Sequence, residues 1–148
     1  MQSYYTMEIG FFAGSFDLCH TGHVLGFKEA RENCDKLIIG LQVDPSVDRK
    51  EKNKPIMSVE ERQIILSGIR YIDEIKKYST EADLVRMVRE LKPAVYFLGE
   101  DWRNKESLVK KACKEMGIRI HYLVRNHTYS SSGLRQKIYL SESERKGR

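Results

Sequence analysis

Short runs of apolar residues alternate along the chain with longer segments in which apolar residues recur every three or four positions. The short runs are typical of buried parallel strands, and the longer segments have the period of amphipathic helices. Strands are expected at Met7–Ala13, Lys36–Gln42, Ala94–Leu98 and Ile118–Val124, with a further short strand that begins within Arg70–Ile75. This alternation predicts an α/β fold: a doubly wound, Rossmann-like parallel sheet of about five strands with helices on both faces.

Capping residues mark where the helices between these strands begin and end. Ser58 and Glu61 form a capping-box pattern ahead of a helix whose apolar face would contain Ile65, Leu66 and Ile69. Other helices are expected from the turn after residue 20 to about Asn33, at Thr80–Leu91, at Leu108–Met116, and from the Ser130–Ser132 cap to about Leu140. Residues 43–55 are expected to form a long polar loop.

The composition describes one globular domain. Of the 148 residues, 41% are hydrophobic and 32% are charged. We expect the domain to span residues 1–140 and residues 141–148 to form a basic, frayed tail. The apolar runs are too short for a membrane span, and the first residues lack the pattern of a signal peptide. Three unevenly spaced cysteines argue against a disulfide framework or zinc site and favour a reducing cytoplasm.

The segment from Gly14 to His23 follows the first expected strand and opens the first expected helix. Free backbone N–H groups and the positive end of the helix dipole would make this turn an anion site. His20 and His23, three residues apart, would project from the same face of the helix. Gly22 between them would allow a ligand to approach the backbone closely. We therefore expect the turn to bind an anionic ligand.

The sequence His20-Thr21-Gly22-His23 matches the HxGH signature of the nucleotidylyltransferase superfamily. With its lead-in, it resembles the cytidylyltransferase branch, whose version reads G-T-F-D-L-x-H-x-G-H. The resemblance runs from about Ile9 to Ile138 and is strongest to glycerol-3-phosphate cytidylyltransferases and bacterial heptose-phosphate adenylyltransferase domains. It implies transfer of a nucleotidyl group from CTP to a small phosphomonoester such as glycerol 3-phosphate. An adenylyltransferase that uses ATP on a sugar phosphate is the alternative. The resemblance also implies a homodimer.

The same resemblance implies which residues form the site, because their positions match the motifs of the family. The expected catalytic residues are His20, His23, Lys50 and Arg125. Nucleotide-binding residues are expected at Gly14, Ser15, Phe16, Asp17, Gly22, Gly99, Asp101, Ser130, Ser131 and Ser132. Lys52, Arg62 and Trp102 are expected to bind the acceptor substrate, and which of the two loop lysines contributes most is left open. Asp17 and Asp101 are the candidate ligands for Mg²⁺, although Asp17 could instead orient its loop by hydrogen bonding.

A formal net charge of +5 suggests an anionic partner. Nucleic-acid binders usually show a recognisable module or a basic patch interleaved with aromatic residues, and neither is evident. A pocket for a nucleoside triphosphate accounts for the concentration of charge at Arg49–Lys54. We therefore expect a nucleoside triphosphate and a small phosphorylated substrate as partners, with no nucleic acid and no membrane.

In the reaction expected, a phosphate oxygen of the acceptor attacks the α-phosphate in line and pyrophosphate leaves. The histidines would donate hydrogen bonds to the α-phosphate, and neither needs to act as a general base. Other histidines, His121 and His127, are expected to have structural roles, and Phe16, Phe27 and Tyr96 are expected in the core. The rival hypotheses are a nucleotide-binding sensor without turnover and a nucleic-acid-binding protein, which rests on net charge alone.

Overall fold

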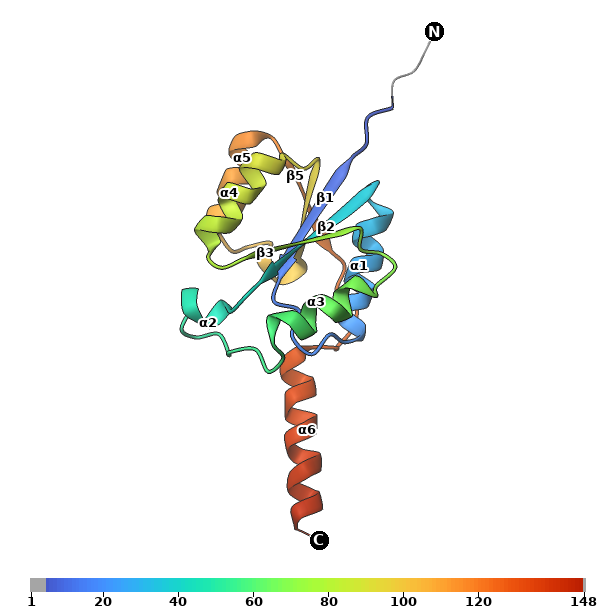
Figure 1. Ribbon diagram of the computed structural model, residues 1–148, viewed down its shortest axis with the longest axis vertical. Coiled ribbons are helices and arrows are strands. Elements are labelled where there is room, and N and C mark those ends of the chain that lie inside the picture. Colours follow the sequence, from blue (N-terminus) through green and yellow to red (C-terminus); the bar gives the residue numbers. More distant parts are fainter. Residues whose placement is uncertain (1–4, 148) are drawn as a thin grey trace.

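The computed structural model describes residues 5–147 as a five-stranded parallel sheet surrounded by helices (Figure 1). Its strands are β1 (Ile9–Gly14), β2 (Lys36–Gln42), β3 (Glu74–Tyr78), β4 (Val95–Gly99) and β5 (Arg119–Leu123). They lie in the order β3-β2-β1-β4-β5, and every neighbouring pair is parallel. The predicted Rossmann-like sheet of five strands is confirmed. Within residues 5–147, no helix is long and apolar enough to cross a membrane.

The strand order changes direction between β1 and β4. The chain adds β2 and β3 outward on one side of β1, then returns to place β4 on the other side. In such sheets ligands bind beyond the carboxyl ends of the strands, at the point where the order reverses. This topology places the segments that follow β1 and β4 beside each other.

Alternating side chains of the strands build one apolar layer on each face of the sheet. On one face α1 (Thr21–Glu32) and α3 (Val59–Ser67) contribute Phe27 and Leu66, which are fully buried against Leu37. On the other face α4 (Glu81–Leu91) and α5 (Leu108–Met116) lie side by side and contribute Val88 and Cys113. The predicted core residues Phe16, Phe27 and Tyr96 are at most 5% exposed, which confirms their burial.

Helix ends agree with the capping residues that the sequence contains. Ser58 accepts a hydrogen bond from the backbone N–H of Glu61, whose carboxylate accepts one from Ser58 N–H in return. Thr80 and Asp83 form the same reciprocal pair at the start of α4, and Ser107 caps α5 by accepting a hydrogen bond from Lys110 N–H. Gly117 ends α5 with a φ of 69°, a left-handed conformation that glycine adopts without a Cβ penalty.

The segment after β2 is not the continuous loop that we expected. It contains a short helix, α2 (Pro45–Asp48), because Asp44 accepts a hydrogen bond from Ser46 N–H and Pro45 occupies the first helical position. Helix α3 ends at Ser67, before Arg70, and its apolar face is narrower than predicted. Of the expected residues, Leu66 is fully buried, whereas Ile65 is 37% exposed.

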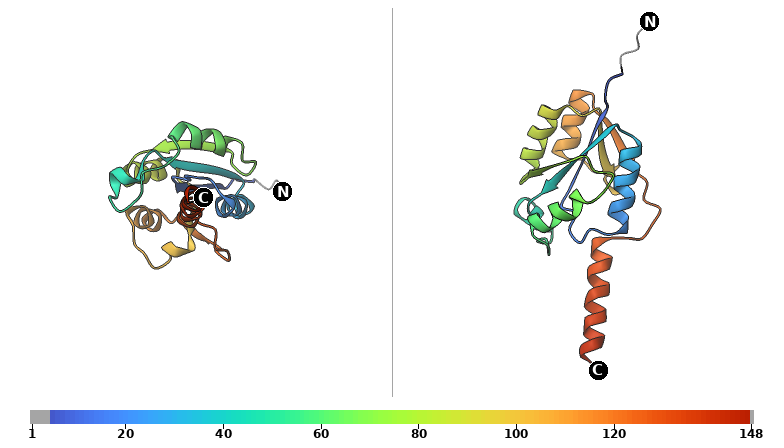
Figure 2. Two further views of the ribbon diagram at one scale, coloured as in Figure 1. Left: turned by 90° about the horizontal axis from the view of Figure 1, so that it is seen from below. Right: turned by 45° about the vertical axis from the view of Figure 1, so that its right-hand side comes forward.

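Helix α6 (Ser131–Lys146) continues six residues beyond the predicted end at Leu140. It projects alone from the carboxyl edge of the sheet, at the end of the molecule opposite the N-terminal segment (Figures 1 and 2). Residues 141–146, expected in a frayed tail, are helical. None of the α6 residues is buried, so packing against the domain does not account for its length.

Candidate active site

Two cavities open beyond the carboxyl ends of the strands. The first, called here the histidine cavity, has a volume of about 240 Å³ and is lined by His20, His23, Asp101, Arg125 and His127 among others. The second, called the tyrosine cavity, has a volume of about 250 Å³ and is lined by Tyr78, Tyr96, Gln42, Arg49 and Trp102 among others. The end of β1 and the 3₁₀ turn η1 (Glu100–Trp102) contribute to both. Two ligands could therefore meet over β1.

His20 and His23 form a capping box at the start of α1. Nδ1 of His20 accepts a hydrogen bond from Gly22 N–H at 3.0 Å, and Nδ1 of His23 accepts one from His20 N–H at 3.2 Å. The two rings stack with their centroids 3.8 Å apart. A neutral imidazole that accepts at Nδ1 carries its proton on Nε2. The helix start thus fixes one tautomer in both rings and leaves Nε2–H as the donor.

Both imidazoles are held in the neutral form. Burial and the neighbouring His20 lower the pKa of His23 to about 4. Burial, His127 and Arg125 lower the pKa of His20. Near neutral pH the pair consequently acts as two neutral hydrogen-bond donors at the positive end of α1, a combination that suits a phosphate group.

The loop between β1 and α1 has an unusual backbone. Phe16 and Leu18 both have a φ of 50°, in the left-handed region that bulky residues rarely occupy. Phe16 is 5% exposed, and its ring meets the His23 ring edge-on at 5.5 Å. It was expected to contact the nucleotide, but it lines neither cavity and instead supports the imidazole.

Gly22 lies where two imidazoles converge. A Cβ on this residue would lie 2.9 Å from Cε1 of His20 and 2.9 Å from Cε1 of His127. The missing side chain therefore makes room for histidine rings, in addition to the space for a ligand that the sequence suggested. His127 was expected to have a structural role, yet its ring lines the histidine cavity.

Asp17 anchors a neighbouring loop. Its two oxygens accept hydrogen bonds from Ile56 N–H at 2.8 Å and Met57 N–H at 3.0 Å, and Arg135 lies 3.8 Å away. The side chain is 12% exposed and lines neither cavity. This is the loop-orienting role that we considered as the alternative to metal binding. Asp17 therefore fits poorly as a ligand of Mg²⁺.

Asp101 is the carboxylate that fits a magnesium ion. It is exposed on η1 and lines the histidine cavity. Residues 5–147 contain no group of three or more histidine, cysteine or acidic side chains that could hold a metal ion. Magnesium is often held by one or two carboxylates together with phosphate oxygens, so of the two candidates Asp101 is the one that could contact a metal bound to a nucleotide in this cavity.

Arg62, expected to bind the acceptor substrate, is buried and holds loop carbonyls instead of lining either cavity. It is 2% exposed, and its guanidinium donates to the carbonyls of Ser15 at 2.9 Å, Gln42 at 2.6 Å and Val43 at 2.6 Å. These bonds tie the loops after β1 and β2 to α3. Burial disfavours the charged guanidinium, and the carbonyl groups offset that cost. Arg62 therefore shapes the tyrosine cavity without lining it.

The segment between β5 and α6 is fixed by Glu29 of α1. Its carboxylate accepts from Val124 N–H at 3.0 Å and lies 2.7 Å from Nε2 of His121. Val124 directly precedes Arg125, which is exposed and lines the histidine cavity. Ser130 caps α6 by accepting from Gly133 N–H at 3.0 Å. A second helix start and a guanidinium therefore lie beside the histidines.

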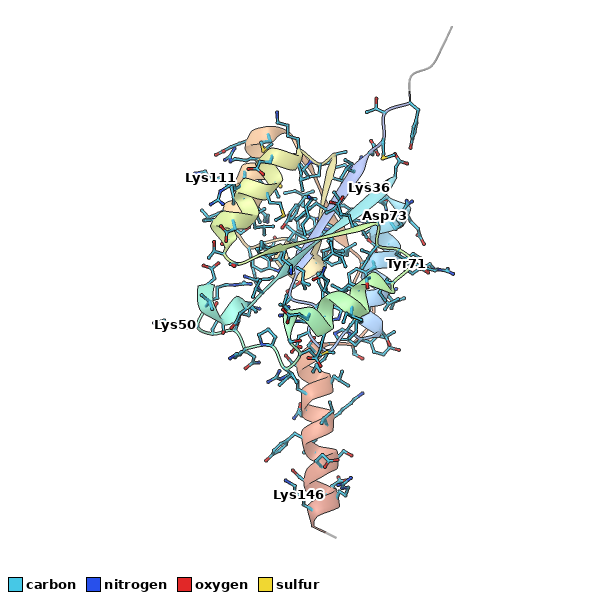
Figure 3. The ribbon with its side chains drawn as sticks, in the orientation of Figure 1. Lys36, Lys50, Tyr71, Asp73, Lys111 and Lys146 are labelled. Atoms are coloured by element: carbon cyan, nitrogen blue, oxygen red, sulfur yellow. The ribbon has the colours of Figure 1, made fainter. Side chains whose placement is uncertain are left out.

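Of the three basic side chains Arg49, Lys50 and Lys52 after β2, two line the tyrosine cavity and one does not. Lys52 and Arg49 line the tyrosine cavity, and the Arg49 guanidinium lies 5.7 Å from the ring centre of Trp102. Lys50 lines neither cavity and lies at the outer edge of the molecule beside α2 (Figure 3). Lys50 and Lys52 were both expected near phosphate, and the geometry favours Lys52. No motif marks Arg49 as a site residue, although it lies in the basic run at Arg49–Lys54.

The structure brings together most of the predicted site residues, but in two cavities. The histidine cavity contains His20, Gly22, His23, Gly99, Asp101, Arg125, Ser130 and Ser131. The tyrosine cavity contains Gly14, Ser15, Lys52 and Trp102, of which Gly14 and Ser15 were expected to bind nucleotide. Lys50, Phe16, Asp17, Arg62 and Ser132 line neither cavity.

Comparison with known proteins identifies relatives that share this site region. Residues 11–137 match the protein-family model described as Cytidylyltransferase-like. The chain is 31% identical over 136 residues to the bifunctional protein HldE of Helicobacter pylori (strain HPAG1), a match that covers 91% of this chain and 28% of HldE. The chain thus spans little more than a quarter of the HldE relative. It is 31% identical over 121 residues to FAD synthase of Aciduliprofundum boonei, covering 82% of this chain and 79% of that protein.

A solved structure has the same fold. The lipopolysaccharide core biosynthesis protein from Thermoplasma volcanium GSS1 superimposes with a TM-score of 0.70 at 25% sequence identity. The match covers 82% of this chain and 100% of that one.

Proposed function

Because the chain belongs to the cytidylyltransferase-like family of the HxGH nucleotidyltransferase superfamily, we propose that it transfers a nucleotidyl group from a nucleoside triphosphate to a small phosphomonoester. The observation that supports this most directly is the pair of stacked, neutral histidines at the start of α1. Both rings line a cavity that also contains Arg125 and the start of α6. This set of donors suits the phosphates of a nucleotide.

In the proposed arrangement the nucleoside triphosphate occupies the histidine cavity and the acceptor occupies the tyrosine cavity. The two ligands would meet over the end of β1, which contributes to both. Lys52 and Arg49 would pair with the acceptor phosphate, and Arg125 with the triphosphate. An acceptor phosphate oxygen attacks the α-phosphorus, the bond from that phosphorus to the β-bridging oxygen breaks, and pyrophosphate leaves with the electron pair.

The histidines accelerate this step by hydrogen bonding. Charge builds on the α-phosphate oxygens and on the leaving bridge, and an Nε2–H fixed in position stabilises that charge without reorganisation. A general base is not needed, because the attacking phosphate oxygen already lacks a proton. Mg²⁺, held by Asp101 and the phosphate oxygens, would neutralise charge on the triphosphate.

We propose ATP as the nucleotide donor to test first. The relative named FAD synthase is named for an adenine-containing product, and it aligns over most of its own length. The expectation of CTP and glycerol 3-phosphate rests on sequence motifs and on the description of the family, and we retain it as the competing proposal. Pyrophosphate release with Mg²⁺ should be measured for ATP and CTP, each against glycerol 3-phosphate and several sugar phosphates.

A substitution at His20 tests the role of the imidazole separately from its role as a cap. Asparagine is a good N-cap residue, so His20→Asn retains an acceptor for the helix start and removes the Nε2–H donor. We expect turnover to fall by about 10²–10³ while the melting temperature stays near that of the wild type. Turnover close to wild type in this variant would contradict the proposal. Triphosphate binding without pyrophosphate release from the wild-type protein would favour the sensor hypothesis.

A further inference from the structure

Arg125 lies in a segment that has no regular structure of its own. Residues 124–130 belong to neither a helix nor the sheet, and Val124 and Arg125 are exposed. Exposed chain without ladder hydrogen bonds is the part of a protein that opens most easily. A guanidinium that has to meet an anion in a fixed position therefore needs an anchor close to it in the chain.

Glu29 of α1 is such an anchor, because it holds the residue directly before Arg125. Its Oε1 and Oε2 accept from the Val124 N–H at 3.0 Å and 3.2 Å. A hydrogen bond to a carboxylate is charge-assisted and roughly twice as strong as one between neutral groups. The Glu29 side chain is only 23% exposed, so water competes for these bonds in part.

His121 of β5 holds the same carboxylate. Its Nε2 lies 2.7 Å from Oε2 of Glu29, and because a carboxylate oxygen accepts, Nε2 is the donor. The His121 ring meets the ring of Phe97 edge-on, with centroids 5.4 Å apart, and Phe97 is fully buried. The sheet therefore fixes His121, His121 orients Glu29, and Glu29 holds the chain before Arg125.

The helix that carries Glu29 also carries the two histidines of the site. His20 and His23 lie at the start of α1. Further along α1, Gly26 lines the histidine cavity, and a Cβ on it would lie 3.5 Å from Cδ1 of Leu123, the last residue of β5. Helix α1 and the end of β5 are therefore in close contact along this wall. One helix thus sets the positions of the imidazoles and of the segment that bears Arg125.

Electrostatics also bring Arg125 close to the histidines. Burial, His127 and the charge of Arg125 lower the pKa of His20. Glu29 and His121 line neither cavity, so a ligand in the histidine cavity would not contact them. An effect of Glu29 on such a ligand must therefore pass through the segment that it holds or through its charge.

We propose that Glu29 is a positioning residue: by holding Val124 it fixes Arg125 relative to His20 and His23, so that the three donors meet one triphosphate. This inference rests on the proposed function for the identity of the anion. It does not depend on turnover, because triphosphate binding can be measured by itself.

Charge and position predict opposite effects for Glu29→Gln. Loss of a negative charge near an anion site would by itself strengthen triphosphate binding. The amide, however, presents a donor where the carboxylate had a second acceptor oxygen, so Val124 and His121 lose part of their anchor. We expect calorimetry to show an affinity for ATP and CTP that is about three- to tenfold lower. The matched control is Glu32→Gln, the same charge change at the exposed end of α1, which should not weaken binding.

A double-mutant cycle tests whether the effect passes through Arg125. Arg125→Ala should weaken triphosphate binding about 10- to 100-fold. Adding Glu29→Gln to it should then change the affinity by less than about twofold, because the group being positioned is gone. His121→Phe leaves the carboxylate charge in place and should weaken binding as Glu29→Gln does, again only when Arg125 is present.

Urea unfolding of the same variants separates positioning from a role in stability alone. Lower stability with unchanged triphosphate affinity in Glu29→Gln would overturn the inference, as would an equal loss of affinity with and without Arg125. If the cycle behaves as described but the wild type releases no pyrophosphate, the proposed function fails and the inference stands. Failure of both ATP and CTP to bind the wild type would overturn both.

Discussion

The first turn of α1 uses two imidazoles where most helices use a hydroxyl or a carboxylate. The capping bonds occupy Nδ1 of His20 and of His23, so each ring keeps a single donor. Neutral rings cost less to bury than charged ones, and two stacked imidazolium ions would repel each other. The cap, the burial and the stacking thus all favour the same protonation state.

Stability should therefore depend on the protonation of His23. Its pKa falls from 6.5 in the unfolded chain to about 4 in the folded one. Between pH 6.5 and pH 4 the unfolded chain binds a proton at this ring and the folded chain does not. The contribution of neutral His23 to the free energy of unfolding is therefore complete above pH 6.5 and is lost as pH falls toward 4. Glutamine can occupy the same position of a capping box without titrating in this range. On acidification from pH 7.5 to 4.5, His23→Gln should lose about 2–3 kcal/mol less free energy of unfolding than the wild type.

Urea unfolding at the two pH values checks this, because groups outside the stacked His20–His23 pair titrate equally in both proteins. Parallel pH profiles for the wild type and His23→Gln would contradict the pKa assigned to the ring.

Residues with a local signature could be predicted from the sequence, and residues that depend on tertiary contacts could not. His20, His23 and Arg125 lie in or beside short motifs, and the structure places all three at one cavity. The phenols of Tyr78 and Tyr96 come from β3 and β4, which are not neighbours in the sheet, and no local pattern marks their shared cavity. The carbonyl contacts of Arg62 could not be foreseen, because a helical arginine that is buried against loop carbonyls has the same local pattern as one at the surface.

At the level of elements, the turn η1 depends on a lysine from a different helix. Lys110 of α5 is 1% exposed, and its ammonium donates to the carbonyls of Trp102 at 2.9 Å, Arg103 at 3.3 Å and Lys105 at 2.6 Å. All three protons of the ammonium are thereby used. Trp102 lines the tyrosine cavity and Asp101 lines the histidine cavity. By holding η1, Lys110 therefore positions the wall between the two cavities.

Replacing this lysine should destabilise the protein. We expect Lys110→Met to lower the free energy of unfolding by about 2 kcal/mol, because three carbonyls lose a charged donor. Lys111→Met is the matched control, since Lys111 is exposed and points away from the domain (Figure 3). It should change stability by less than about 0.5 kcal/mol. Equal stability of the two variants in urea unfolding would show that the buried ammonium does not hold η1.

The strands and most helix starts could be read from the sequence because apolar runs and capping residues are local signals. The end of α6 could not, because Ser141–Lys146 are polar and contact no core that would reveal a helical period. An unpacked helix of 16 residues is marginal in water. Amides of α6 beyond its first turn should therefore exchange with solvent near the unstructured rate, whereas those of β1 and β2 should be strongly protected. Hydrogen-exchange mass spectrometry measures both.

At the scale of the molecule, the resemblance to cytidylyltransferases predicts a homodimer. Helix α6 leaves Ile138 50%, Tyr139 71% and Leu140 51% exposed, outside the folded domain. We expect sedimentation equilibrium to give twice the chain mass of 17.3 kDa. If α6 contributes to that contact, its amides should gain protection as protein concentration rises. A single species of 17.3 kDa at high micromolar concentration would contradict the prediction.

The division of the site into two cavities has a consequence for how such proteins diverge. Among the residues that the structure describes, none lines both cavities, although β1 and η1 each supply neighbouring residues to the two. Mutations in α2 or at the ends of β3 and β4 can therefore remodel the pocket for one reactant while the histidines, Arg125 and the chemistry they support stay intact. Descendants of one ancestral gene could in this way acquire new acceptors by changing a few side chains, each intermediate still competent to break the same phosphoanhydride bond.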